Sequence, residues 1–246
     1  MNNLSDFHIH IDYFKNYNQI FHSFNKNKIY ALFVTNLPEI FQQCRKEFPD
    51  SKYVKLALGY NPQLANKYKF NQSLFDDLLP FTKYVGEVGL DYSKEFLASK
   101  NDQQVAFEYI CFQSAKLNRI MSIHSRKAES DVLSILINNN VKFAVLHWYS
   151  GNKRILQKAV NQGYYFSVNY SMLSTQKGFD IIRSIPLDRL LIETDAPFGN
   201  TNVNGKHYDL PGIYNKFSKK LDIDSFEIII HQNLRRLLEE QGNVLY

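Results

Sequence analysis

The stretch Asp6-Phe-His-Ile-His-Ile-Asp12 alternates polar and apolar residues, which is the pattern of a β-strand with two different faces. Asp6, His8, His10 and Asp12 are expected on one face, and the apolar residues on the other. Two imidazoles at positions i and i+2 can bind one cation together. The alternative is a pair of core histidines that hydrogen-bond to their neighbours. The flanking carboxylates favour a metal site.

Seven further apolar segments are predicted as strands, and most are followed by a helical pattern. The eight expected strands are Asp6–Asp12, Tyr30–Thr35, Val54–Asn61, Tyr84–Asp91, Ile120–His124, Phe143–Trp148, Tyr164–Asn169 and Leu190–Asp195. The expected helices are Tyr13–Lys28, Glu39–Phe48, Gln103–Asn118, Lys127–Asn138, Asn152–Gln162, Gln176–Ile185 and Ser225–Glu240, the last closing the outer layer. Alternating strands and helices predict parallel βαβ units. Eight units within residues 1–246 predict a single-domain (β/α)₈ TIM barrel.

Local signals mark several boundaries. Gly163 is expected at the C-terminal end of the Asn152–Gln162 helix, and Ser174 is a candidate N-terminal cap for the next one. Residues 199–211 are rich in Asn and Gly, which predicts a loop above the last strand.

Composition limits the class of protein further. With 44% hydrophobic residues, the chain can build one buried core, and no apolar run approaches the roughly 18 residues of a membrane span. The N-terminus lacks the pattern of a signal peptide, and Cys44 and Cys111 have no metal-type spacing, so we expect a cytoplasmic protein without a membrane partner. The net charge of +5 is compatible with a polyanionic partner without requiring one.

The fourth expected strand carries the residues Tyr84-Val-Gly-Glu-Val-Gly-Leu-Asp-Tyr92. Glu87, Gly89 and Asp91 are expected on a common face, where the glycines would let a ligand approach closely. A carboxylate such as Glu87 can bridge two divalent ions. The alternative is an ion pair at one end of the barrel.

The fifth and sixth strands each end in a histidine, at the carboxyl end where barrel active sites are built. These residues are His124 and His147. A buried histidine bonded to a carbonyl oxygen is the alternative for either one alone. Arg126 can bind a phosphate through its fork of N–H groups, and Trp148 can stack on a base or sugar, although a surface ion pair and packing are their commoner roles.

The eighth strand ends in Glu193-Thr-Asp195, with both carboxylates on one face. Asp195 can act both as a metal ligand and as the acceptor of a proton from water. Taken alone, two acidic residues after three apolar ones could instead mark an ordinary transition from a strand to a loop. Five strands together deliver candidate ligands, so accidental packing would have to be repeated on all of them. The candidate set is His8, His10, Glu87, His124, His147 and Asp195, whereas His22, His207 and His231 are left out.

These motifs resemble the TatD family of metal-dependent deoxyribonucleases, within the amidohydrolase-like barrels. The matching segments are Asp6-Phe-His-Ile-His, Gly86-Glu-Val-Gly-Leu-Asp91, Ile123-His-Ser-Arg126, the His147 segment, Glu193-Thr-Asp-Ala-Pro197 and Asn233-Leu-Arg-Arg-Leu237. The resemblance implies exonucleolytic hydrolysis of DNA phosphodiesters with two divalent ions, of Zn, Mn or Mg. On this hypothesis His8, His10, Glu87 and Asp195 hold one ion, and Glu87, His124 and His147 hold the other. Asp195 and Glu87 are the catalytic residues, and Arg126 and Trp148 position the substrate.

A narrower resemblance is to the TatD-type nucleases of Qat anti-phage systems. It is carried by residues 58–65, 83–91, 122–128, 145–151 and 166–168. This resemblance implies a defence role beside an ATPase and a QueC-like protein. One departure concerns Asn61, which stands before Pro62 where the family commonly has His. Asn61 can hydrogen-bond a phosphate or substrate, but it cannot carry a proton at neutral pH.

Two other functions stay open at this point. An amidohydrolase or phosphotriesterase acting on a small substrate is the nearest, although many two-metal relatives of that kind bridge their ions with a carboxylated Lys rather than with a Glu. A barrel that serves mainly as a binding subunit of a defence complex is the other. The substitution at position 61 favours the binding subunit, and retention of every expected ligand opposes it.

Overall fold

Parallel strands form at all eight predicted apolar segments, in the order in which they follow one another along the chain. The computed structural model describes residues 4–199 and 209–242. The strands are β1 (Ser5–His10), β2 (Tyr30–Val34), β3 (Val54–Ala57), β4 (Tyr84–Gly89), β5 (Ile120–His124), β6 (Ala144–His147), β7 (Tyr165–Val168) and β8 (Leu190–Ile192). Most are shorter than predicted, because residues near their ends already turn toward a loop.

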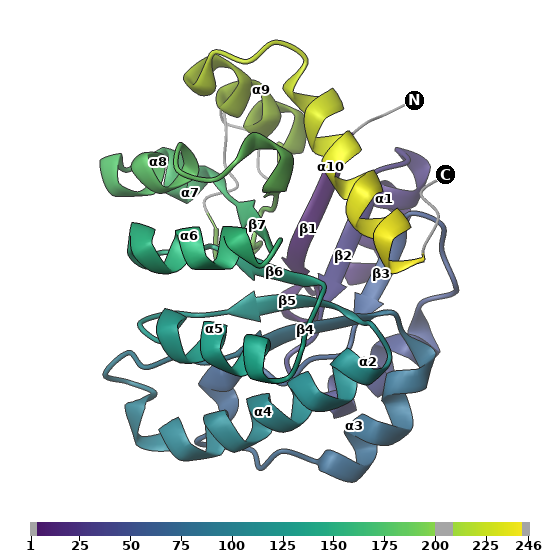
Figure 1. Ribbon diagram of the computed structural model, residues 1–246. Coiled ribbons are helices and arrows are strands. Elements are labelled where there is room, and N and C mark those ends of the chain that lie inside the picture. Colours follow the sequence, from purple (N-terminus) through teal and green to yellow (C-terminus); the bar gives the residue numbers. More distant parts are fainter. Residues whose placement is uncertain (1–3, 200–208, 243–246) are drawn as a thin grey trace.

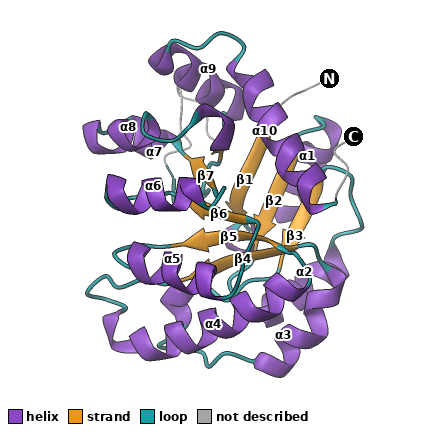
Figure 2. Cartoon of the chain, in the orientation of Figure 1, coloured by secondary structure: helices purple, strands orange, loops and turns teal. Residues whose placement is uncertain are grey.

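The strands form two parallel sheets, β1-β2-β3 and β4-β5-β6-β7-β8. Isolated parallel bridges join the sheets at both junctions, Ile9 with Ala196 and Leu58 with Val85. The eight strands therefore form one ring, as expected for the (β/α)₈ barrel, although two of its eight junctions are single bridges rather than ladders. The helices lie outside this ring (Figure 1, Figure 2).

Every predicted helix is present, with shifted ends, and three helices were not predicted. The helices are α1 (Tyr17–Lys26), α2 (Pro38–Glu47), α3 (Gln72–Leu78), α4 (Lys100–Lys116), α5 (Glu129–Asn138), α6 (Lys153–Asn161), α7 (Tyr170–Leu173), α8 (Gln176–Ile182), α9 (Leu210–Leu221) and α10 (Phe226–Gln241). The unpredicted ones are α3, α7 and α9. Within residues 4–199 and 209–242, no helix has both the length and the apolar character that crossing a membrane requires.

Two of the boundary predictions need correction. Gly163 follows α6 with φ of 81°, as expected of a glycine at that position. However, Ser174 ends α7, and the side chain of Thr175 caps α8 by accepting a hydrogen bond from Gly178 N. Of the predicted loop 199–211, residues 200–208 lie outside the described part of the chain, and Pro211 belongs to the first turn of α9.

The interior of the ring is filled by a cluster that takes residues from every strand, and α10 covers its amino-terminal end. Leu234, Leu237 and Leu238 of α10 belong to the same buried cluster as Phe7 and Leu191. The side chain of Asn233 donates hydrogen bonds to two carbonyl oxygens just before and within β8, at 2.7 and 2.9 Å. The last helix therefore seals one mouth of the barrel, rather than only extending the outer layer. The other mouth is left for the polar residues.

Candidate metal centre

His8 and His10 of β1 point into the barrel and meet at their Nε2 atoms, which are 3.2 Å apart. The predicted sharing of one face by all four polar residues of this strand is wrong. The pairing of β1 with β2 shifts register between Asp6 and Ile9, so Phe7 joins the interior cluster. Asp6 instead accepts hydrogen bonds from Thr194 N and Oγ1, at 2.9 and 2.6 Å. A β-bulge of this kind re-aims side chains at barrel rims.

Glu87 of β4 lies between the histidines of several strands. Its Oε1 atom is 2.8 Å from His124 Nδ1 and 2.8 Å from His147 Nε2, and its Oε2 atom is 3.5 Å from His10 Nε2. The two oxygens therefore face different groups of nitrogen atoms. Gly89 does not leave space for a ligand, contrary to prediction. A Cβ atom there would lie 2.0 Å from His124 O, so this glycine allows β5 to approach.

His124 and His147 end β5 and β6, and each has a carboxylate on the side of the ring that faces away from Glu87. Asp91 Oδ2 is 2.9 Å from His124 Nε2, and Glu193 Oε1 is 3.6 Å from His147 Nδ1. The His147 ring also stacks on His8, with centroids 4.0 Å apart. The two imidazoles are thus fixed with one nitrogen atom toward Glu87 and the other toward a second acid.

Asp195 follows β8 and completes the group around β1. Its backbone N–H donates to His8 O at 2.9 Å, and its Oδ1 atom lies 3.6 Å from His8 Nε2 and 3.3 Å from His10 Nε2. This Oδ1 atom is buried and has no hydrogen-bond partner. Glu193 shares the strand end with Asp195 but is occupied differently, because Ser167 and Asn169 donate hydrogen bonds to its two oxygens.

Asn61 lies beside Glu87, at the start of a short 3₁₀ turn after β3. Its amide nitrogen donates to Glu87 Oε2 at 2.5 Å and to Asn36 Oδ1 at 2.8 Å. Its oxygen accepts from Gln63 N at 2.9 Å. Every polar atom of the Asn61 side chain is therefore used, and its position is fixed by the residues around it.

Burial and mutual charge shift the pKa values of the cluster in opposite directions. Burial lowers the pKa of His8 well below its usual range, and the proximity of His147 adds to this effect. Burial also disfavours the charged form of His147, but the carboxylates of Glu193 and Glu87 together outweigh it and raise the pKa of His147 well above its usual range. For Glu87, burial favours the protonated form, but His124 and His147 together outweigh it, and the pKa of this carboxyl lies well below its usual range. Glu87 is therefore held in its negatively charged form, and a positive charge beside it is stabilised.

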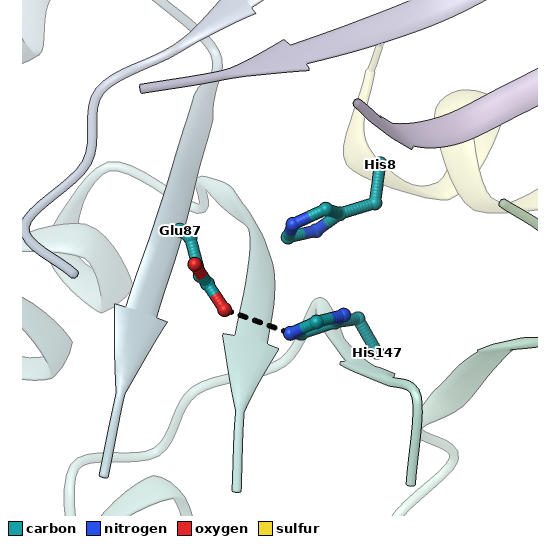
Figure 3. A group of neighbouring side chains, drawn as sticks. All are labelled: His8, Glu87 and His147. Atoms are coloured by element: carbon teal, nitrogen blue, oxygen red, sulfur yellow. Dashed lines mark hydrogen bonds and ion pairs between the residues drawn. The ribbon is translucent and has the colours of Figure 1, made fainter. Parts of the chain in front are cut away.

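The donor set fits a divalent cation. Ligand atoms of His8, Glu87 and His147 lie within 4.8 Å of one another, and so do those of His8, His10 and Asp195. Figure 3 shows the first group, with the three side chains pointing toward one another. Buried atoms without hydrogen-bond partners in the cluster are His10 Nδ1, His147 Nδ1 and Asp195 Oδ1. Neutral imidazoles and carboxylates suit Zn²⁺, Mn²⁺ and similar ions, and a cation would supply the positive charge that Glu87 attracts.

A cavity of about 800 Å³ opens over the cluster. Its lining includes Asn61, Arg126 and Trp148, the three predicted substrate-binding residues, together with the polar cluster. The Arg126 side chain is exposed and that of Trp148 is half-buried. The structure thus brings all the predicted site residues to one mouth of the barrel.

The prediction missed several residues that hold the cluster in place. Ser122 Oγ lies 2.8 Å from His8 Nδ1, and Asn36 donates to Asp12 at 2.6 Å while it accepts from Asn61. The sequence pattern places Asp91 on the face of Glu87 but does not mark it as part of the site. Its position two residues beyond Gly89 on the strand of Glu87 was an available signal. Ser122 and Asn36 carry no signal in the sequence.

An α/β barrel that gathers histidines and carboxylates at the carboxyl ends of its strands has the architecture of a barrel enzyme, whose active site lies at that end. The family described as TatD related DNase matches residues 5–239. The chain therefore belongs to the TatD family, whose deoxyribonucleases are hydrolases that act on phosphodiester bonds.

Individual relatives agree with this assignment. The chain is 33% identical over 155 residues to "Deoxyribonuclease Tat-D" of Schizosaccharomyces pombe, covering 62% of this chain and 46% of that one. The match thus spans less than half of the relative's length. It is 28% identical over 174 residues to "3'-5' ssDNA/RNA exonuclease TatD" of Edwardsiella piscicida, covering 67% and 66%. The solved structure of the TatD homologue YjjV from Escherichia coli has a TM-score of 0.79 at 20% identity and covers 96% and 98%, which shows a common fold.

Proposed function

We propose that this protein is a metal-dependent deoxyribonuclease that removes nucleotides from the ends of DNA strands. The observation that carries the proposal is the position of Glu87, whose two oxygens face separate groups of histidine nitrogens inside one cavity. In an ordinary buried ion pair, a carboxylate has one charged partner, whereas Glu87 has several. A carboxylate shared between groups of candidate ligands is the arrangement of a two-metal hydrolase.

We keep the ligand sets expected from the sequence, which the distances support. His8, His10 and Asp195 would hold one cation together with Glu87 Oε2, and His124 and His147 would hold a second with Glu87 Oε1. Two bound divalent cations would make a water molecule more acidic and would neutralise the charge that develops on phosphorus oxygens.

The chain's own groups account for the remaining roles. Asp195 Oδ1 is buried and makes no hydrogen bond, so besides its place beside a cation it can accept the proton of the attacking water. Arg126 is exposed at the cavity and would bind a backbone phosphate, and Trp148 would contact the sugar or base. Asn61 donates both amide protons within the protein, so we expect it to act on the substrate by orienting Glu87.

The size of the cavity supports action at strand ends. About 800 Å³ lies in the range of small-molecule sites, which suits a single nucleotide at the metal cluster better than a continuous duplex. The name of the Edwardsiella relative describes an exonuclease on single-stranded DNA and RNA, which also supports action at strand ends.

Replacing Glu87 by Gln tests the function, because Gln has nearly the same shape but no negative charge. We expect kcat/KM on a single-stranded DNA oligonucleotide, with Zn²⁺, Mn²⁺ or Mg²⁺, to fall by roughly 10³-fold, which corresponds to several kcal/mol of lost charge stabilisation. The matched control is Glu95→Gln, an exposed carboxylate at the same cavity, which should change the rate by only about twofold. Equal activity of Glu87→Gln and the wild type would reject the proposal.

We further propose that the nuclease is cytoplasmic and serves Qat anti-phage defence, beside an ATPase and a QueC-like protein. The support is the narrower sequence resemblance, two segments of which, residues 58–65 and 122–128, contain the cavity residues Asn61, His124 and Arg126. Co-purification of the tagged full chain with both proteins expressed from one plasmid tests the association. Absence of both proteins from the purified sample would count against it.

A further inference from the structure

Two aromatic side chains at the mouth of the cavity have no role in the function proposed above. Tyr13 and Phe198 are 51% and 56% exposed, although both line the cavity. Their ring centroids are 4.9 Å apart with the planes nearly perpendicular. The Phe198 ring is 5.1 Å from that of His10, and the Tyr13 ring is 5.8 Å from it. A pair of exposed rings therefore stands directly beside the metal cluster.

The backbone segments that place these rings also place the candidate ligands. Tyr13 ends the 3₁₀ turn (Ile11–Tyr13) that follows His10 directly. Phe198 lies three residues after Asp195, and its backbone N–H donates to Asp195 O at 2.8 Å. The two segments are joined by the hydrogen bond from His10 N to Ala196 O. The position of the pair relative to the cluster is therefore fixed by the same contacts that position His10 and Asp195.

An exposed aromatic side chain is ordinary when it stands alone on a convex surface. Here two of them touch within a concave site that also contains buried charged groups, and such a site commonly takes a ligand with an apolar part. Tyr13 and Phe198 follow β1 and β8, whereas Arg126 and Trp148 follow β5 and β6, so the two pairs lie on different sides of the mouth. A ligand centred on the metal cluster can contact both.

We propose that Tyr13 and Phe198 bind one of the two nucleobases that flank the scissile phosphate, one ring stacking on its face and the other, nearly perpendicular, packing against its edge. This inference rests on the proposed nuclease function and adds the residues that select a base-bearing substrate. Every nucleobase has an aromatic face, so stacking on protein rings is strong and tolerant of sequence. The rings would thus distinguish a nucleic acid from a phosphodiester that lacks a base.

The test is a comparison of substrates with and without a base at one position. Single-stranded DNA oligonucleotides carry an abasic tetrahydrofuran residue at the terminal or at the penultimate nucleotide, and kcat/KM is measured for each. We expect the wild type to lose about tenfold at one of these two positions. In the double variant Tyr13→Ala/Phe198→Ala, we expect the intact substrate to lose the same factor and the abasic substrate to lose nothing further.

Two controls separate stacking from a merely structural effect. The double variant Tyr13→Phe/Phe198→Tyr keeps both rings and should keep the discrimination. Phe112→Ala removes a ring of similar exposure, 50%, on the outer face of α4, and should behave as the wild type. The inference is overturned if the wild type treats intact and abasic substrates alike, or if the double Ala variant discriminates as strongly as the wild type.

Failure of the inference differs from failure of the nuclease proposal. A wild-type protein that cleaves intact oligonucleotides without regard to the abasic positions overturns only the stacking role. A wild-type protein that cleaves no oligonucleotide with any of the three metals overturns both. Binding by the Glu87→Gln variant supplies a second measurement, in which removal of both rings should weaken the Kd for the intact oligonucleotide by about tenfold.

Discussion

Two of the candidate histidine ligands, His8 and His124, are each oriented by a hydrogen bond to a second side chain. Ser122 Oγ is 2.8 Å from His8 Nδ1, so the Nε2 atom of His8 is the one that faces the cluster. Asp91 Oδ2 is 2.9 Å from His124 Nε2, so Nδ1 of His124 faces Glu87. These partners determine which ring nitrogen is available as a ligand and keep the ring in place.

Replacing Asp91 by Asn tests this orienting role. Asn keeps the size of the side chain but removes the charge that accepts the His124 N–H, so we expect metal affinity to fall by about 10- to 100-fold. The measurement is competition for Zn²⁺ or Mn²⁺ with a chromogenic chelator, at unchanged far-UV circular dichroism. Asp188→Asn is the control, because that carboxylate is exposed and lies on the loop before β8. Metal affinity equal to that of the wild type in Asp91→Asn would contradict the assignment.

The candidate ligands could be predicted from single residues, because each lies on or directly after a strand with a clear apolar pattern. Their supporting partners could not. Ser122 is a small polar residue within an apolar run, and its meaning depends on β5 lying opposite His8 in space. Asn61 was identified only as a departure from the family, and its double hydrogen bond became visible with the fold.

Two strands that carry the cluster depart from regular pairing. The register shifts between Asp6 and Ile9 on β1 and between Val85 and Val88 on β4, so both shifts bracket a candidate ligand. Strict alternation along a strand predicts the wrong face for residues next to such a shift. His8 and Glu87 nevertheless lie inside the barrel, as predicted. Alternation gives the wrong face for the neighbour of His8, Phe7, which lies in the interior cluster.

Gly89 shows how tightly β4 and β5 must pack at the site. A Cβ atom there would lie 2.0 Å from His124 O, and its φ is 141°, which disfavours any side chain. We expect Gly89→Ala to destabilise the protein by about 3 kcal/mol or more in urea unfolding, from backbone strain and strand separation together. Gly163→Ala is the matched control. Its φ is 81° with no atom within 4 Å of the new Cβ, so its cost should be only about 1–2 kcal/mol. Equal costs would show that contact with β5 is unimportant.

All but one of the predicted helices have nine residues or more, whereas two of the three missed helices are shorter. α3 has seven residues and α7 has four, which gives periodicity little to act on. α9 was not predicted, because Pro211 was assigned to the loop 199–211. In the structure Asp209 caps this helix through Gly212 N and Pro211 stands in its first turn, which is a favourable place for proline.

At the scale of the molecule, the candidate metal centre spans the boundary between the two sheets. His8 and His10 belong to the three-stranded sheet, whereas Glu87, His124 and His147 belong to the five-stranded one. Between the sheets, isolated bridges are accompanied by a few backbone hydrogen bonds, such as Thr35 N to Gly86 O and Glu87 N to Thr35 O, both 3.1 Å. α10 and the interior cluster hold the opposite end of the barrel together. At the polar end, side-chain contacts across the boundary, such as that of His10 Nε2 with Glu87 Oε2 at 3.5 Å, add to these few backbone bonds.

A cation that binds this cluster should therefore stabilise the whole barrel. Binding to the folded state alone at 100 times the Kd contributes about 2.7 kcal/mol, which corresponds to a rise in Tm of about 5–10 °C for a domain of this length. The measurement is thermal unfolding of chelator-treated protein with and without added Zn²⁺, Mn²⁺ or Mg²⁺. Glu87→Gln should lose most of the rise, because Glu87 faces both ligand groups, while Phe112→Ala should keep it. An unchanged Tm with all three metals would mean that the cluster is a network of hydrogen bonds and ion pairs, and the assignment of both metal sites would fall with it.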